Sequence, residues 1–188
     1  MPLRDYSHAF VVGENCTPVK QLQLAAQGTG LPMERIKGPF DWLIAPLPAV
    51  IEAIRSRFDG FFDRRLVTLD GYSAGYWRVH APGGLCSLHH FPRHDGDAGI
   101  SAHSWARFDR WLGDRINRFE MALAHPANCV LILRLQSASQ PDDPEALAEL
   151  CGLLTKRAQA TVRVAAVSYQ RRPSIHEHVP DFVVEVGS

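Results

Sequence analysis

A cysteine, an aspartate and a pair of histidines are the residues whose types and spacing could do chemistry. Cys16 follows the apolar run at residues 9–12 and comes directly before Thr17 and Pro18. Threonine is a good N-cap and proline suits the first helical position, so this order predicts a strand, a turn and the start of a helix. The unpaired N–H groups at a helix N-terminus favour the thiolate form of a cysteine. We therefore predict that Cys16 is a nucleophile.

The turn around Cys16 also contains candidate groups for stabilising an oxyanion. Gly13 permits a sharp turn, and Asn15 and the backbone N–H groups at Cys16 to Val19, Thr17 among them, could donate hydrogen bonds to developing negative charge. A nucleophile placed between a strand and a helix is the arrangement of a nucleophile elbow. The alternative is that Cys16 is one of four small, buried apolar residues.

A cysteine nucleophile needs a base, and the adjacent His89 and His90 are the best candidates among nine histidines. Neighbouring residues of a strand point to opposite faces, so only one imidazole can face Cys16, and we favour His90 slightly. Asp41 stands between Phe40 and Trp42, and its carboxylate could orient the histidine or cap the helix that follows. The alternative for the histidines is one packed in the core and one on the surface.

Metal and nucleotide sites have weaker support. Potential metal ligands gather at His89, His90, His94, Asp95 and His103. Their spacing matches no standard zinc motif, so we expect neither a metal nor a cofactor. The GENC segment at residues 13–16 has one glycine, whereas loops that cradle phosphates need several.

Composition limits the partners. The chain has 188 residues, 46% of them hydrophobic, and 20 basic residues balance 20 acidic ones. There is no basic field to attract nucleic acid, no apolar run of membrane-spanning length and no signal-peptide pattern. The four cysteines are scattered without a CxxC pair, which fits free thiols in the cytoplasm. We expect a small-molecule, peptide or glycan substrate and leave the oligomeric state open.

The elements that must position these residues form one predicted α/β domain over residues 1–188. Strands are predicted at residues 9–12, 66–69, 76–80, 86–91, 130–135 and 162–167, with 181–186 as a candidate edge strand. Asp70 and Gly71 are predicted as a turn. Helices are predicted to begin at Thr17, Pro46, Ser104 and Asp143. Strands alternating with helices favour an open, largely parallel sheet with helices on both faces, in flavodoxin-like or Rossmann-like layering. Sites in such sheets lie at the carboxyl ends of the strands, where Cys16 and the histidine pair are both predicted.

Several motifs together resemble a bacterial family of papain-like cysteine peptidases. The resemblance covers residues 9–135 and rests on Gly13, Cys16, Pro39, Phe40, Asp41, Trp42, His89 or His90, Phe91, Arg115, Arg118, Phe119 and Arg134. It implies that Cys16 is the nucleophile and that a histidine is its base. The chain departs from the family pattern in its doubled histidine, and the expected strand order is closer to a flavodoxin-type sheet than to a papain fold.

Two other functions are compatible with the sequence. The first is an esterase similar to the SGNH type that acts on carbohydrate or acyl esters. SGNH-type esterases place a serine after the first strand of a parallel sheet, and Cys16 occupies a similar place. Their histidine lies near the C-terminus in a D-x-x-H motif, whereas Asp181 here follows His176 and His178. The second alternative is a non-catalytic binding or accessory protein that retains the fold and a cleft.

Overall fold

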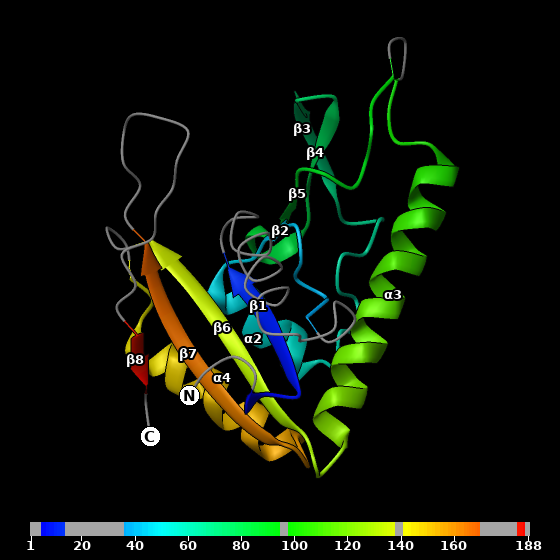
Figure 1. Cartoon of the computed structure of the whole chain (residues 1–188). Helices are drawn as coiled ribbons and strands as arrows, with labels where there is room; N and C mark the ends of the chain where they lie inside the picture. Colours follow the sequence, from blue (N-terminus) through cyan, green and yellow to red (C-terminus); the bar gives the residue numbers. More distant parts are fainter. Residues whose placement is uncertain (1–4, 14–35, 95–97, 138–140, 170–183, 187–188) are drawn as a thin grey trace.

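The central sheet is parallel, with one antiparallel edge strand. The computed structural model describes residues 5–13, 36–94, 98–137, 141–169 and 184–186. Strand β1 (His8–Gly13) lies parallel to β6 (Cys129–Ser137), which lies parallel to β7 (Thr161–Tyr169) (Figure 1). Strand β8 (Val184–Val186) runs antiparallel to β7 at the edge. The strands predicted near residues 9–12, 130–135 and 162–167 are confirmed, as is an edge strand within 181–186.

Alternation along these strands divides the sheet into two apolar faces. Side chains such as Phe10 and Ile132 pack in one core with α2 (Leu47–Arg55), α3 (Ala102–Ala124) and α4 (Pro144–Arg157). Their neighbours Val11 and Leu131 belong to a second, smaller core. All three described α-helices therefore contribute to the same core, so helices on both faces are not seen in the described residues. The helix predicted from Thr17 lies outside them.

A second sheet, which the sequence reading did not separate from the first, is wholly antiparallel. Its order is β2 (Leu43–Ile44), β5 (Cys86–Ser87), β4 (Tyr76–His80) and β3 (Thr68–Ser73). A short 3₁₀ segment (Pro82–Gly84) connects β4 to β5. The connections from β3 to β4 and from β4 to β5 are short, which suits antiparallel neighbours, because parallel neighbours need a long crossover.

Three local boundaries differ from the predictions. Asp70 and Gly71 lie within β3, and the turn falls at Ala74 and Gly75, which both have positive φ. Strand β5 ends at Ser87, before the histidines. The N-cap of α3 is Ser101, whose side chain accepts a hydrogen bond from Ser104 N–H, one turn earlier than predicted. Asp143 caps α4, as predicted.

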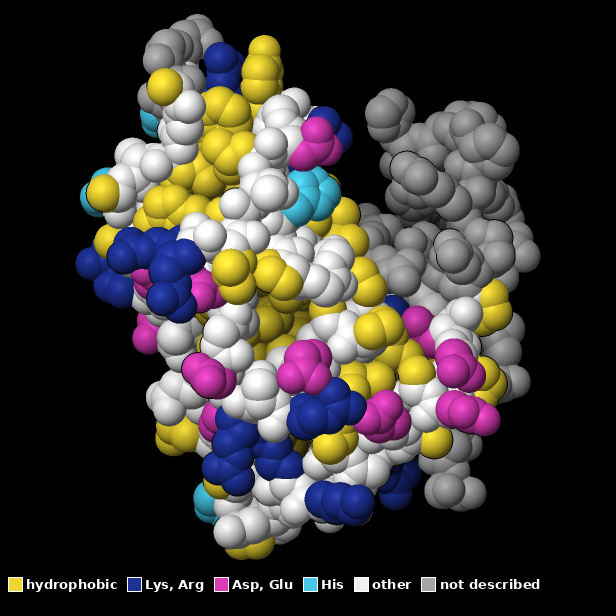
Figure 2. Space-filling model, turned by 180° about the vertical axis from the view of Figure 1, so that it is seen from behind, with side chains coloured by type: hydrophobic (Ala, Val, Ile, Leu, Met, Phe, Trp, Pro, Cys, Tyr) yellow, Lys and Arg dark blue, Asp and Glu magenta, His cyan; other side chains and the backbone are white. Residues whose placement is uncertain are grey.

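The surface is mixed in character. Figure 2 shows apolar side chains gathering toward the upper end of one face, with both signs of charge interspersed over the lower half. Leu66, Leu69 and Tyr72, on or next to edge strand β3, are among the exposed large apolar residues. No helix in the described part of the chain is both long and apolar enough to cross a membrane.

Candidate functional site

The histidine pair lies in a bend between β5 and a short return along β4. Beyond the bend, Trp77 N–H donates to Phe91 O at 2.8 Å and Arg93 N–H donates to Gly75 O at 2.9 Å. Tyr76 and Pro92 form a β-bridge at the same point. Both ends of the bend are therefore held by backbone hydrogen bonds, which limits the movement of His89 and His90.

His90 is the more buried of the two and is packed on aromatic rings. Its imidazole centroid lies 4.1 Å from that of Trp111 and 5.2 Å from that of Phe108. Its Nδ1 is 2.8 Å from the hydroxyl of Ser87, which is itself fully buried. Burial, reinforced by the charges of His89, Arg115 and Arg107, lowers the pKa of His90 from 6.5 to about 3. The imidazole is consequently neutral at pH 7.

His89 is exposed and lies on the other side of the bend. Its ring centroid is 5.7 Å from that of Trp42 and 5.9 Å from that of Tyr76. The two histidines therefore contact different aromatic neighbours, as expected for adjacent residues that diverge.

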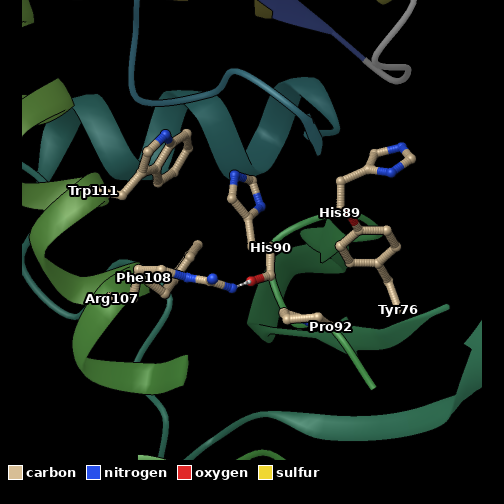
Figure 3. Close-up of a pocket in the computed structure, with 7 residues that line it drawn as sticks. All are labelled: Tyr76, His89, His90, Pro92, Arg107, Phe108 and Trp111. Atoms are coloured by element: carbon tan, nitrogen blue, oxygen red, sulfur yellow. Dashed lines mark hydrogen bonds between the residues drawn. The ribbon is translucent and has the colours of Figure 1, made fainter. Parts of the chain in front are cut away.

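Both histidines line a pocket of about 400 Å³. Figure 3 shows Arg107, Phe108 and Trp111 projecting from α3 on one side, with Tyr76 and His89 on the other and His90 between them. The lining residues are Tyr76, His89, His90, Pro92, Arg107, Phe108 and Trp111. This volume falls in the range of small-molecule sites.

Asp41 is paired with an arginine. Its carboxylate Oδ2 accepts hydrogen bonds from Arg115 Nη1 at 2.6 Å and from Gly38 N–H at 3.1 Å, and the residue is 1% exposed. Burial raises the pKa of this carboxyl from 3.8 to about 7, although Arg115 and Gly38 act in the opposite direction. Oδ1 is buried without a hydrogen-bond partner among the described residues. Both bonds to Oδ2 thus stabilise the turn at residues 38–41 and attach it to α3.

Trp42 follows Asp41 in an unusual backbone conformation. Its φ is +61°, a region that bulky residues rarely adopt. Such a conformation persists where surrounding contacts hold the residue in place, as also for the positive φ of Arg57, Phe58, Phe62 and Ala74. Here the anchored Asp41 precedes Trp42, whose ring contacts His89.

The carboxyl end of β1 is tied to the second sheet. Gly13 O accepts a hydrogen bond from Ala45 N–H at 2.8 Å, and Ala45 O accepts one from Arg134 Nη1 at 2.8 Å. A Cβ on Gly13 would lie 2.9 Å from Leu135 Cβ. Gly13 ends β1 without a positive φ, and its close approach to Leu135 gives one reason for a glycine here. The turn predicted after Gly13 lies outside the described residues. Cys16, Asn15 and Thr17 lie outside the described residues.

Arg134, near the carboxyl end of β6, was not predicted as a functional residue from its chemistry, although it is one of the residues that carry the family resemblance. It is fully buried, and its Nε and Nη2 donate to the two carboxylate oxygens of Asp142 at 2.7 and 2.8 Å. A lone arginine in an apolar strand is the signal that could have found it, because buried arginines are nearly always paired.

A second cysteine also has an imidazole neighbour. Cys86 Sγ lies 3.7 Å from His80 Nε2, and the same Nε2 lies 3.6 Å from an Asp70 carboxylate oxygen. One ring nitrogen cannot both accept the thiol proton and donate to a carboxylate, so this is not the relay of a catalytic triad. Burial also raises the pKa of the Cys86 thiol. In the described ranges, no three potential ligands are grouped to hold a metal ion.

Comparison with known proteins gives no assignment. No family model matches this chain, and no curated protein and no solved structure matches it.

Proposed function

We propose that the chain is a cysteine-dependent hydrolase in which Cys16 attacks an acyl carbon and a histidine of the pocket acts as the general acid and base. The observation that carries this proposal is a continuous path of contacts from the end of β1 to the histidines. Gly13 bonds to Ala45, β2 pairs with β5 through Leu43 and Ser87, and the Trp42 ring contacts His89.

This path supports the prediction that Cys16 and the histidine pair lie close together. Cys16 is three residues beyond Gly13 in the sequence, and three residues span at most roughly 10 Å. Because Gly13, the last residue of β1, is bonded to Ala45, we expect Cys16 near the end of β1 at which β2 and β5 of the second sheet lie (Figure 1).

We assign the base to His89 rather than to His90. A thiolate is stabilised by an imidazolium, and a group with a pKa of about 3 does not hold a proton at pH 7. His90 is instead packed on Trp111 and held by Ser87. His89 is exposed and lines the pocket, so its imidazole is accessible to a substrate and to water.

In the proposed reaction the Cys16 thiolate forms a bond to the acyl carbon and the leaving group departs with the proton held by His89. A water molecule, deprotonated by His89, then attacks the thioester and releases the carboxylic acid and the thiol. Backbone N–H groups near Cys16 are the expected oxyanion donors. Asp41 is proposed as a positioning residue, which acts through Trp42.

Alkylation of the intact chain with iodoacetamide between pH 5 and 9 tests this proposal, with each cysteine followed by mass spectrometry. We expect Cys16 to react faster than Cys86, Cys129 and Cys151 at low pH, because its thiol is already ionised. His89→Ala should abolish this advantage, and His103→Ala, at an exposed position, is the matched control. A Cys16 that alkylates no faster than the other three thiols would contradict the proposal.

Turnover assays separate the remaining possibilities. Hydrolysis of activated esters without hydrolysis of amides would favour the esterase alternative. Binding of a ligand that survives Cys16→Ala, with no acyl-enzyme detected by intact-mass measurement, would favour the non-catalytic alternative.

A further inference from the structure

The pocket beside the histidines has a chemical character of its own. Trp111 and Phe108 form one wall, and Tyr76 lies on the opposite side (Figure 3). The rings of Trp111 and Tyr76, which are both partly exposed, provide flat apolar surface that aromatic ligands contact by offset or edge-to-face stacking, whereas Phe108 is buried. Because His90 between these walls is uncharged at pH 7, the interior favours a flat, largely apolar group.

Charge at the pocket is one-sided. Arg107 is exposed, and its Nη2 donates to His90 O at 3.1 Å, which holds the guanidinium beside the pocket. None of the described residues that line the pocket is acidic. Arg115, whose guanidinium lies 5.2 Å from the Trp111 ring centroid, is paired with Asp41, so Arg107 carries the positive charge among the described residues that line the pocket. An aromatic cage that binds a cation would have acidic residues beside the rings rather than an arginine. The charge at this pocket therefore favours an anionic ligand.

We propose that this pocket binds the aromatic acyl group of the substrate, with the ring packed against Trp111 and Tyr76 and the carboxylate of the product attracted by Arg107. The assignment of an acyl group rests on the proposed hydrolase function. Binding of a free aromatic carboxylate does not rest on that function, because it requires only the residues of the pocket.

The first test measures binding alone. Benzoate, cyclohexanecarboxylate and benzylamine are titrated into the full-length Cys16→Ala variant, and the indole N–H and imidazole signals are followed by NMR. Benzoate is expected to bind about tenfold more tightly than the other two, because only it combines a flat ring with a negative charge. Equal or tighter binding of benzylamine would overturn the proposal, as would equal binding of cyclohexanecarboxylate.

Variants locate the binding site. Trp111→Ala and Arg107→Ala are each expected to weaken benzoate binding about tenfold. Arg110→Ala, an exposed change on the same helix, should leave it unchanged. Tyr76→Ala provides a second wall variant should Trp111→Ala fail to fold. Unchanged affinity in folded wall variants would overturn the proposal.

A final comparison separates this inference from the proposed function. Wild-type protein is assayed with phenyl-ring acyl esters and with acetyl esters of the same alcohol. Benzoate binding without any ester turnover would leave the pocket assignment standing and remove the hydrolase. Turnover of acetyl esters with no benzoate binding and no preference for aromatic acyl groups would support the hydrolase and remove the pocket assignment.

Discussion

Arg115 Nη1 donates to Asp41 Oδ2 at 2.6 Å and so joins α3 to the turn that precedes Trp42. These two residues, which are 74 positions apart in the sequence, form a buried ion pair between α3 and the turn that leads to Trp42. Side-chain exposure is 13% for Arg115 and 1% for Asp41, so solvent does little to screen this contact.

Removing the arginine should destabilise the protein strongly. Arg115→Ala leaves a buried carboxylate without its cation, and breaking such a pair typically costs about 3–5 kcal/mol of unfolding free energy. Arg110→Ala, at an exposed position of the same helix, should change it by less than about 0.5 kcal/mol. Urea denaturation at pH 8 measures both variants. Similar midpoints for the two would show that the pair contributes little.

The protonation of Asp41 should give stability a distinct pH dependence. Its pKa is raised in the folded protein, so between about pH 4 and 7 the folded state binds more protons than the unfolded state. The contribution of this group to stability therefore falls as pH rises through that window. We expect the stability of wild type relative to Asp41→Asn to increase as pH is lowered from 7 to 4. A relative stability that is constant across this window would contradict the raised pKa.

His90 should act in the opposite direction. Its folded pKa of about 3 lies below the ordinary 6.5, so the unfolded state binds more protons as the solution becomes acidic. Stability from this group is fully present above about pH 6.5 and is lost as pH falls toward 3. Imidazole NMR signals recorded from pH 8 to 4 should show His90 still neutral at pH 5. A titration midpoint near 6.5 would show that the ring is solvated.

Arg134 is expected to stabilise the edge of the sheet from which the predicted nucleophile follows. Arg134→Ala removes the bonds to Asp142 and Ala45 and should cost about 3–5 kcal/mol. Arg134→Lys should recover only part of this, because an ammonium cannot make the two-pronged contact. Arg163→Ala, at an exposed position of β7, is the control. Thermal denaturation that ranks Lys equal to arginine would contradict this explanation.

Two glycines should respond oppositely to alanine. Gly13→Ala places a Cβ against Leu135 and should destabilise by about 1–3 kcal/mol. Gly113→Ala, in α3 with open space around it, should stabilise by about 1 kcal/mol through helix propensity. Chemical denaturation of both variants checks the pair. A neutral Gly13→Ala would mean that β1 and β6 can separate locally at no cost.

The parallel strands and two of the helix starts were predictable from sequence, because their signals are local. An apolar run such as residues 130–135 indicates a buried strand, and Asp143 followed by Pro144 indicates a helix start wherever they occur. The division into two sheets was not predictable in this way. It depends on which strands pair, and pairing is decided by contacts between distant residues.

The same distinction applies to the candidate site. Sequence alone singled out Asp41 and the two histidines by residue type and neighbours. Only the tertiary structure decided their environments: Asp41 pairs with Arg115 from α3, and His90 is buried against Trp111 while His89 stays exposed. Burial and charge pairing depend on which elements pack together, and they set the protonation state of each group. A residue's identity therefore limits the chemistry that it can do, and the packing around it selects among those possibilities.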